Sequence, residues 1–139
     1  MAAFGAMDPE DQRRLDDLAQ RETAYGLFQR AGVLLKRRHH AQAAVLLERA
    51  DRLEPNKGSI LEALARAYYN SGQHDRSEDA FRRLIDIDPS APYGHFGLGQ
   101  SLKMLGRPNE ARTHLRLAVA LAPNSSLYRN ALARLGAPK

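Results

Sequence analysis

The feature that most constrains this sequence is a repeat with a period of 34 residues. Pro55, Pro89 and Pro123 are spaced by this distance, and they lie in three similar stretches, Leu-Glu-Pro-Asn, Ile-Asp-Pro-Ser and Leu-Ala-Pro-Asn. Periods of about 20 to 50 residues are typical of chains in which one small structural unit stacks on the next. The repeated units cover residues 24–57, 58–91 and 92–125.

Side chains of the same size recur at matched positions of the three units. One position holds only small residues, Ala31, Ala65 and Gly99, as closely packed helices require. Three other positions hold large apolar residues, and a fourth is again small. Further matched sets are Leu34, Tyr68 and Leu102; Ala43, Ser77 and Ala111; Leu47, Phe81 and Leu115; and Leu53, Ile87 and Leu121. The repeat is therefore visible throughout each unit and not only at its proline.

Within each unit the apolar residues have helical spacing. In the second unit Leu61, Leu64 and Tyr68 lie on one helical face, and a second helical pattern follows and runs to the proline. Gly72 and Gly106 mark the break in successive units, because glycine can end a helix in a left-handed conformation. Each unit is therefore predicted to be a helix-turn-helix hairpin. A lone hairpin cannot bury its apolar face, so the hairpins must stack.

These features resemble the tetratricopeptide repeat family. The resemblance rests on the 34-residue period, the small position, the large position four residues after Ala43, Ser77 and Ala111, and the final proline. The sequence departs from the family pattern where a Trp is usual and where Arg38 replaces the turn glycine. The residues at the Trp position are Leu27, Leu61 and His95. The resemblance implies an all-α, right-handed superhelical solenoid of three repeats.

The two ends of the chain extend this array. Residues 8–23 are predicted to be an N-terminal helical extension, either a short separate helix or part of one long helix over about 9–37. Residues 126–139 are predicted to hold a C-terminal capping helix and a tail. Its apolar stripe consists of Leu127, Ala131, Leu132 and Leu135. Residues 1–7 are interpreted as a remnant of an expression vector or a disordered tail, with their native origin left open.

The sequence carries no pattern that predicts catalysis. It has no Cys, which excludes disulfides, thiolate metal sites and cysteine nucleophiles. The five His residues lack ligand spacing, and Gly94, Gly97 and Gly99 lie inside a predicted helix rather than in a phosphate-binding loop. We therefore predict no enzyme activity, metal or cofactor. With no apolar run near the roughly 20 residues of a membrane span and no signal peptide, we expect a soluble, cytoplasmic protein.

The resemblance implies a concave face, lined by the first helix of each repeat, that binds peptide segments of other proteins. Five of the nine Phe and Tyr residues map to this face, and we predict that they are apolar anchors: Tyr25, Phe28, Tyr69, Tyr93 and Phe96. The predicted polar contacts are Lys36, Arg66, Asn70, Gln100 and Lys103. Because other apolar residues already fill the packing positions, we expect these rings to be surplus apolar surface. The alternative is that they pack between repeats.

One known mode of this family is not expected here. Its chaperone-binding members hold a terminal carboxylate with Lys, Asn and Arg side chains at five fixed positions. The matching residues in this sequence are Phe28, Gly32, Ala63, Tyr93 and Gly97, which include no such side chain. The sequence is therefore predicted not to be of this carboxylate-clamp type.

The expected function is a non-enzymatic adaptor for protein–protein interaction. One alternative is a scaffold that forms homodimers through its terminal helices. A less favoured alternative is nucleic-acid binding, suggested by a net charge of +5 and by the pairs Arg37-Arg38 and Arg82-Arg83. Acidic residues are interleaved with these arginines, which is typical of a solvated helix face. The sequence does not identify the partner protein.

Overall fold

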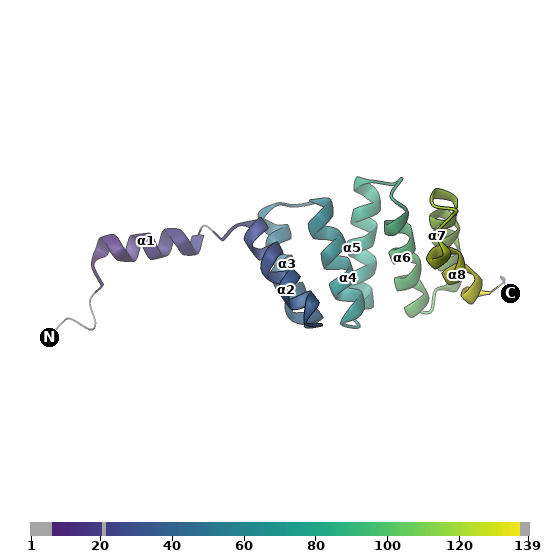
Figure 1. The fold of residues 1–139 in the computed structure, drawn as a ribbon, viewed down its shortest axis with the longest axis horizontal. Coiled ribbons are helices and arrows are strands. Elements are labelled where there is room, and N and C mark those ends of the chain that lie inside the picture. The colour runs from purple at the N-terminus through teal and green to yellow at the C-terminus, as the bar shows by residue number, and fades with distance from the viewer. Residues whose placement is uncertain (1–6, 21, 137–139) are drawn as a thin grey trace.

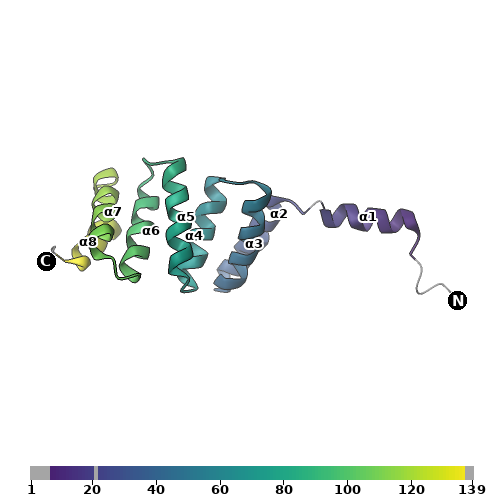
Figure 2. The same cartoon turned by 180° about the vertical axis from the view of Figure 1, so that it is seen from behind.

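The computed structural model describes residues 7–20 and 22–136, and this part of the chain forms eight α-helices (Figure 1). The helices are α1 (Pro9–Gln20), α2 (Ala24–Lys36), α3 (His40–Leu53), α4 (Gly58–Asn70), α5 (His74–Ile87), α6 (Pro92–Met104), α7 (Pro108–Leu121) and α8 (Ser126–Leu135). Helices α2 to α7 pair as three hairpins that stack in chain order, and α8 follows them (Figure 2). The predicted all-α solenoid of three repeats is confirmed.

The turn inside each hairpin has one residue in the left-handed region. Gly72 and Gly106 have φ values of 80° and 75°, as the sequence predicts for helix ends. Arg38 takes the same conformation in the first hairpin, with φ of 61°. The first turn therefore keeps the geometry of the other two without the glycine that favours it.

Helix α1 ends at Gln20 and α2 begins at Ala24, so these residues form two helices and not one long helix over 9–37. Asp8 caps α1, because its carboxylate accepts a hydrogen bond from the Glu10 backbone N–H at 3.2 Å. Thr23 caps α2, since its hydroxyl oxygen accepts from the Gly26 N–H at 2.9 Å. Figure 1 shows α1 extending away from the stacked hairpins. Residues 1–6 of the predicted tail lie outside the described residues.

The core runs along the whole stack. Leu27, Leu61 and Leu98 are at most 1% exposed, and they come from the first helix of successive repeats. The small position is needed for close packing, because a Cβ atom on Gly99 would lie 2.7 Å from Cγ of Leu115. Between the second and third repeats, the buried hydroxyl groups of Ser77 and Ser101 share a hydrogen bond of 2.8 Å. No helix among the described residues is long and apolar enough to span a bilayer.

Helix α8 stands where a fourth repeat would place its first helix. Ala131 is buried, and Leu135 packs against the core. The expected stripe is wrong at Leu127, which is 58% exposed. Tyr128 faces the stacked hairpins instead. It lies 34 residues after Gly94, a buried residue of α6, so it occupies the matching position of the repeat. The C-terminal cap is thereby one helix that covers the last hairpin.

Candidate functional site

A hollow of about 200 Å³ lies between α4 and α6. It brings together six of the ten residues that the sequence predicts for partner binding. These are Arg66, Tyr69, Asn70, Tyr93, Phe96 and Gln100. Phe81 and Gly97 also line it, and neither was predicted as a binding residue. The hollow therefore joins the first helices of the second and third repeats.

Helical spacing explains why these side chains meet. Arg66, Tyr69 and Asn70 are three and four residues apart on α4, so they share one helix face. Phe96 and Gln100 are four residues apart on α6. The stacking of α6 on the preceding repeat then brings the two faces to opposite sides of one hollow.

The floor of the hollow depends on a glycine. Phe81 of α5 is 2% exposed, and its ring lies against the backbone of Gly97 in α6. A Cβ atom at position 97 would lie only 2.1 Å from Cε1 of that ring. A glycine inside a helix, opposite a large residue of the previous repeat, is the sequence signal that could have predicted this floor.

A series of aromatic rings connects the core to α8. Tyr93 packs edge-on against Phe81 with centroids 5.9 Å apart, and Phe96 lies 6.2 Å from Tyr93. Tyr128 of α8 lies 4.9 Å from Phe96. Burial raises the pKa of Tyr93 to about 12, so this hydroxyl stays protonated at neutral pH.

These contacts correct the expectation that all five predicted rings are surplus surface. Tyr93 and Phe28 are half-buried and pack against the core, as the packing alternative proposed. Phe96 is half-buried between Tyr93 and Tyr128. Tyr69 is half-buried beside His74, with ring centroids 5.1 Å apart. Each of these rings lies next to a buried residue on its helix, so one side of the ring contacts the core and the other side stays accessible.

The polar groups of the hollow have unused bonding capacity. The side-chain oxygen of Gln100 is buried and accepts no hydrogen bond from any residue that the structure describes. A buried acceptor without a donor costs roughly 1–3 kcal/mol, so a donor brought by a ligand would relieve that penalty. Arg66 is exposed and forms no ion pair with any described residue.

The other four predicted residues lie outside the hollow. Tyr25 is 66% exposed on α2, where its hydroxyl oxygen accepts from Gln29 Nε2 at 2.9 Å. Phe28 is on the same helix, and Lys36 and Lys103 are exposed near the ends of α2 and α6. The structure therefore divides the predicted site into a hollow and a set of separate residues along the first helices.

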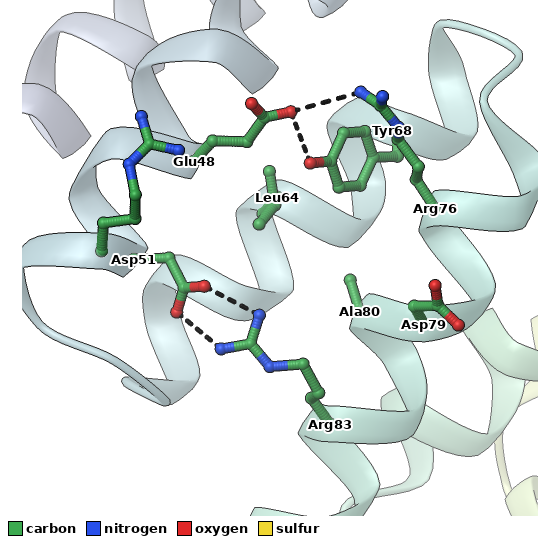
Figure 3. Close-up of a pocket in the computed structure, with 9 residues that line it drawn as sticks. Glu48, Asp51, Leu64, Tyr68, Arg76, Asp79, Ala80 and Arg83 are labelled. Carbon is green, nitrogen blue, oxygen red and sulfur yellow. Dashed lines mark hydrogen bonds and ion pairs between the residues drawn. The ribbon is translucent and has the colours of Figure 1, made fainter.

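A second cleft, of about 380 Å³, lies between α3 and α5 on the second helices of the repeats (Figure 3). Arg83 forms two hydrogen bonds to the Asp51 carboxylate, at 2.7 and 2.8 Å. Glu48 accepts from the Tyr68 hydroxyl at 2.5 Å, and burial and this bond raise the pKa of Tyr68 well above its usual range. These side chains pair with one another across the first and second repeats. The contacts in this cleft therefore help to hold the two repeats together.

The same pairing applies to the arginines that suggested nucleic-acid binding. Arg82 bridges Glu78 at 2.8 Å and Glu110 at 3.0 Å, while Arg83 is held by Asp51. Arginines that already bind carboxylates have fewer free donors for phosphate groups. Of the two arginine pairs, this leaves Arg37-Arg38 without an ion pair among the described residues.

Two of the histidines meet between α6 and α7. His95 is buried, and its Nε2–H donates to the Pro89 carbonyl oxygen at 2.9 Å. Its Nδ1 lies 3.2 Å from Nδ1 of His114, so it accepts from a neutral His114. Burial lowers the pKa of His114, and the neighbouring His95 lowers it further. The pair has the geometry of a packing contact.

Comparison with known proteins places the repeats in a family. The tetratricopeptide repeat model matches residues 25–92 and 62–126. Superkiller complex protein 3 of Mus musculus is 28% identical over 87 residues, which is 63% of this chain and 6% of that protein. Cellulose synthase operon protein C of Salmonella typhimurium is 30% identical over 127 residues, 91% of this chain and 11% of that protein. The chain thus spans a small fraction of both relatives.

A solved structure agrees with the family model. The first tetratricopeptide repeat domain of Spaghetti (RPAP3), bound to the HSP90 peptide SRMEEVD, has a TM-score of 0.77 and 17% sequence identity. The similarity covers 82% of this chain and 90% of that one. At this identity the likeness establishes the fold alone. Since the family model covers most of the chain, the protein belongs to the tetratricopeptide repeat family.

Proposed function

We propose that this protein is a non-enzymatic adaptor that binds a peptide segment of a partner protein in the hollow between α4 and α6. The observation that carries the proposal is the buried oxygen of Gln100, which has no hydrogen-bond donor among the described residues, in a hollow walled by Tyr69 and Phe96. Aromatic walls offer apolar contact area. A buried acceptor without a donor is unfavourable, so a hydrogen bond from a ligand would stabilise the complex. The proposal includes no catalytic step, metal or cofactor, and the cytoplasmic location stays a prediction.

The hollow specifies the chemistry of its peptide. An aliphatic or aromatic side chain would pack over the Phe81 floor beside Gly97. A peptide N–H would donate to Gln100, and a negative group near the same segment would pair with Arg66. The peptide is therefore apolar with some acidic character.

A chaperone tail held by a carboxylate clamp does not fit this chemistry. The solved relative binds an HSP90 peptide. At the five clamp positions this chain has Phe28, Gly32, Ala63, Tyr93 and Gly97, so it lacks the cationic and amide donors for a terminal carboxylate. Binding would instead depend on side chains within the peptide.

The test is a comparison of captured proteins between the parent chain and two variants. The groove variant combines Tyr69→Ala with Gln100→Ala. The control is Arg52→Ala, which removes an exposed side chain of the outer cleft on α3. We expect mass spectrometry to identify a protein held by the parent and the control but lost from the groove variant.

Segments of the captured protein are then synthesised as peptides, and the affinity of each peptide is measured by fluorescence anisotropy. A peptide that binds the parent at least tenfold more tightly than the groove variant supports the proposal. Equal capture by all three proteins would move the function away from the hollow. Retention of nucleic acid alone, with a steep loss of affinity as salt rises, would replace the proposal by the nucleic-acid alternative.

A further inference from the structure

Glu62 of α4 is a half-buried carboxylate that has no partner in the described part of the chain. Its oxygens form no ion pair or hydrogen bond with a described residue. The other half-buried acidic residues whose side chains the structure describes each bind an arginine. They are Glu22, Glu48, Asp51 and Glu78. A partly desolvated charge without a counter-charge is unfavourable, so a cation from outside the chain would stabilise this carboxylate.

Glu62 lies on the face of α4 that lines the hollow. Arg66, which lines the hollow, is four residues later on the same helix and shares this face. Glu62 also occupies the repeat position that holds Phe28 in α2 and Phe96 in α6, because each of these residues is 34 positions away. Figure 1 shows α2, α4 and α6 in this order along the stack. The second repeat therefore has a carboxylate where both neighbouring repeats have an aromatic ring.

Aromatic rings of two later helices lie near this carboxylate. Tyr93 lines the same hollow, and the ring of Phe96 lies 6.2 Å from Tyr93 and 4.9 Å from Tyr128 of α8. Burial is the main reason why the pKa of Tyr93 and the pKa of Tyr128 are raised, and the negative charge of Glu62 raises both pKa values further. Both hydroxyl groups therefore stay protonated at neutral pH, and the face of a neutral ring attracts cations.

We propose that Glu62 and the rings of Phe96 and Tyr128 form a second subsite, which binds a lysine or arginine side chain of the partner peptide. The carboxylate supplies the opposite charge, and charge-assisted hydrogen bonds of this kind are among the stronger ones in proteins. The rings supply apolar contact for the stem of a long cationic side chain and cation–π attraction for its charged end. Neither Glu62 nor Tyr128 lines the hollow, so the subsite is next to the hollow and separate from it.

Arg66 does not already fill this role. It is four residues from Glu62, the spacing of a helical ion pair, but the two side chains form no ion pair in the structure. An exposed pair of this kind contributes little to stability, because water solvates both charges. A peptide that brings a cation to Glu62 and an acidic group to Arg66 would pair both charges.

This inference rests on the proposed function and adds a basic residue to the chemistry of its peptide. The chain has a net charge of +5, so general electrostatic attraction favours acidic peptides. A preference for a basic residue opposes that trend, and local recognition by an acidic side chain accounts for it. The basic residue is therefore a specific sign of binding at Glu62.

The test is a selection of random dodecapeptides, displayed on phage, against the immobilised full chain. The parent is compared with Glu62→Gln, which removes the charge at nearly constant size, and with Glu62→Lys, which reverses it. The matched controls are Asp86→Asn and Asp86→Lys, which make the same changes of charge at an exposed residue of α5. Asp86 forms no ion pair with a described residue.

We expect the parent and both controls to select peptides that carry Lys or Arg at a fixed distance from an apolar residue. One selected peptide is then synthesised with this basic residue and with Glu in its place. By fluorescence anisotropy, the parent should bind the basic form at least tenfold more tightly than the acidic form. Glu62→Gln should lose most of this preference, and Glu62→Lys should prefer the acidic form, since opposite charges then face each other again.

Urea unfolding separates a binding role from a structural one. Because Glu62 has no partner among the described residues, Glu62→Gln should leave the urea midpoint of the free chain unchanged or raise it. A lower midpoint with an unchanged peptide preference would show that the carboxylate supports the fold, and it would overturn the inference.

Two further results would overturn the inference. One is a set of selected peptides without a basic residue, and the other is a preference that Glu62→Lys fails to reverse. If the peptides in these cases still lose affinity for the Tyr69→Ala, Gln100→Ala variant, the proposed function is retained and only the second subsite is wrong. A parent chain that selects no peptide at all would overturn both.

Discussion

The ring of Phe81 occupies the space that a side chain on Gly97 would need, with Cε1 only 2.1 Å from the position of a Cβ atom. Phe81 belongs to the core of the second repeat, and Gly97 belongs to the first helix of the third. One contact thus joins the two repeats and forms the floor of the hollow. Both the stability of the stack and the shape of the candidate site depend on it.

Gly97→Ala is expected to destabilise the protein. The methyl group gains up to about 1 kcal/mol in helix propensity, but it forces the Phe81 ring out of a packed position, and overpacking of this kind typically costs about 1–3 kcal/mol. Gly32→Ala is the control, because nothing lies within 4 Å of the added atom. Urea unfolding should show a loss for Gly97→Ala and a gain of about 0.5–1 kcal/mol for Gly32→Ala. Equal effects at the two glycines would contradict this account.

Arg38→Gly is expected to stabilise the first hairpin. Arg38 has φ of 61°, a region in which a residue with a Cβ atom is strained by roughly 1–2 kcal/mol. Glycine relieves this strain at the cost of some flexibility in the unfolded chain, so the net gain is about 0.5–1 kcal/mol. The reverse change, Gly72→Ala, should cost about 1 kcal/mol at the matching turn. Thermal unfolding of both variants checks the pair, and a loss of stability in Arg38→Gly would show that the arginine has a compensating contact.

The pair of His95 and His114 predicts a loss of stability in mild acid. Burial and His95 lower the pKa of His114 below its ordinary 6.5, so the unfolded chain binds more protons in this range. The contribution is complete above about pH 6.5 and is lost as the pH falls through the folded pKa. Urea unfolding at pH values from about 7.5 to 5.5 should show this decline, and His114→Gln should reduce it.

His39→Gln provides the control for this titration, because His39 is exposed in the turn before α3. Its unfolding curves should keep the pH dependence of the parent. Glu110 also has a lowered pKa, caused first by Arg107, but that carboxylate titrates at lower pH. An unchanged decline in His114→Gln would assign the pH dependence to other groups.

Phe96→Ala is expected to destabilise the protein more than Tyr69→Ala. Phe96 contacts both Tyr93 and Tyr128, so its removal opens a gap between α6 and the capping helix α8. Loss of a half-buried aromatic ring should cost somewhat less than the 3–5 kcal/mol typical of a fully buried one, about 2 kcal/mol. Tyr69 contacts the ring of His74 at the edge of the hollow, and its loss should cost about 1 kcal/mol.

Hydrogen exchange tests whether the larger loss of stability in Phe96→Ala comes from the lost contact with α8. Phe96→Ala should raise the exchange rate of amide protons in α8, whereas Tyr69→Ala should leave them protected. Similar exchange in the two variants would show that the contact of Phe96 with Tyr128 does not hold the cap in place.

The fold follows from the sequence because a 34-residue repeat gives each position three independent examples. The small residues Ala31, Ala65 and Gly99 identify the close contact between helices, and the structure confirms them as buried. Local rules also predict the positive φ of Gly72 and Gly106. The helical pattern alone leaves the break between α1 and α2 open, although Thr23 is a favourable N-cap residue that indicates it.

The candidate site could be predicted only in part. Register alone assigns Arg66, Tyr69 and Gln100 to one side of the solenoid, because helical spacing decides which residues share a face. It does not tell how deeply a ring is buried, and the surplus surface predicted at Tyr93 is instead a contact with Phe81. Depth depends on the side chains of the neighbouring repeat, which the repeat pattern does not specify.

The sequence by itself determined the class of fold, the hairpins and which of the predicted binding residues share one side of the solenoid. Only the tertiary structure decided where the hollow lies, because its floor requires Phe81 of one repeat to meet Gly97 of the next. It also decided that the Arg83 guanidinium is paired with Asp51, which is 32 residues away in the sequence. Periodicity is a property of each helix, whereas a cavity and an ion pair between repeats arise from the packing of side chains that differ from one repeat to another.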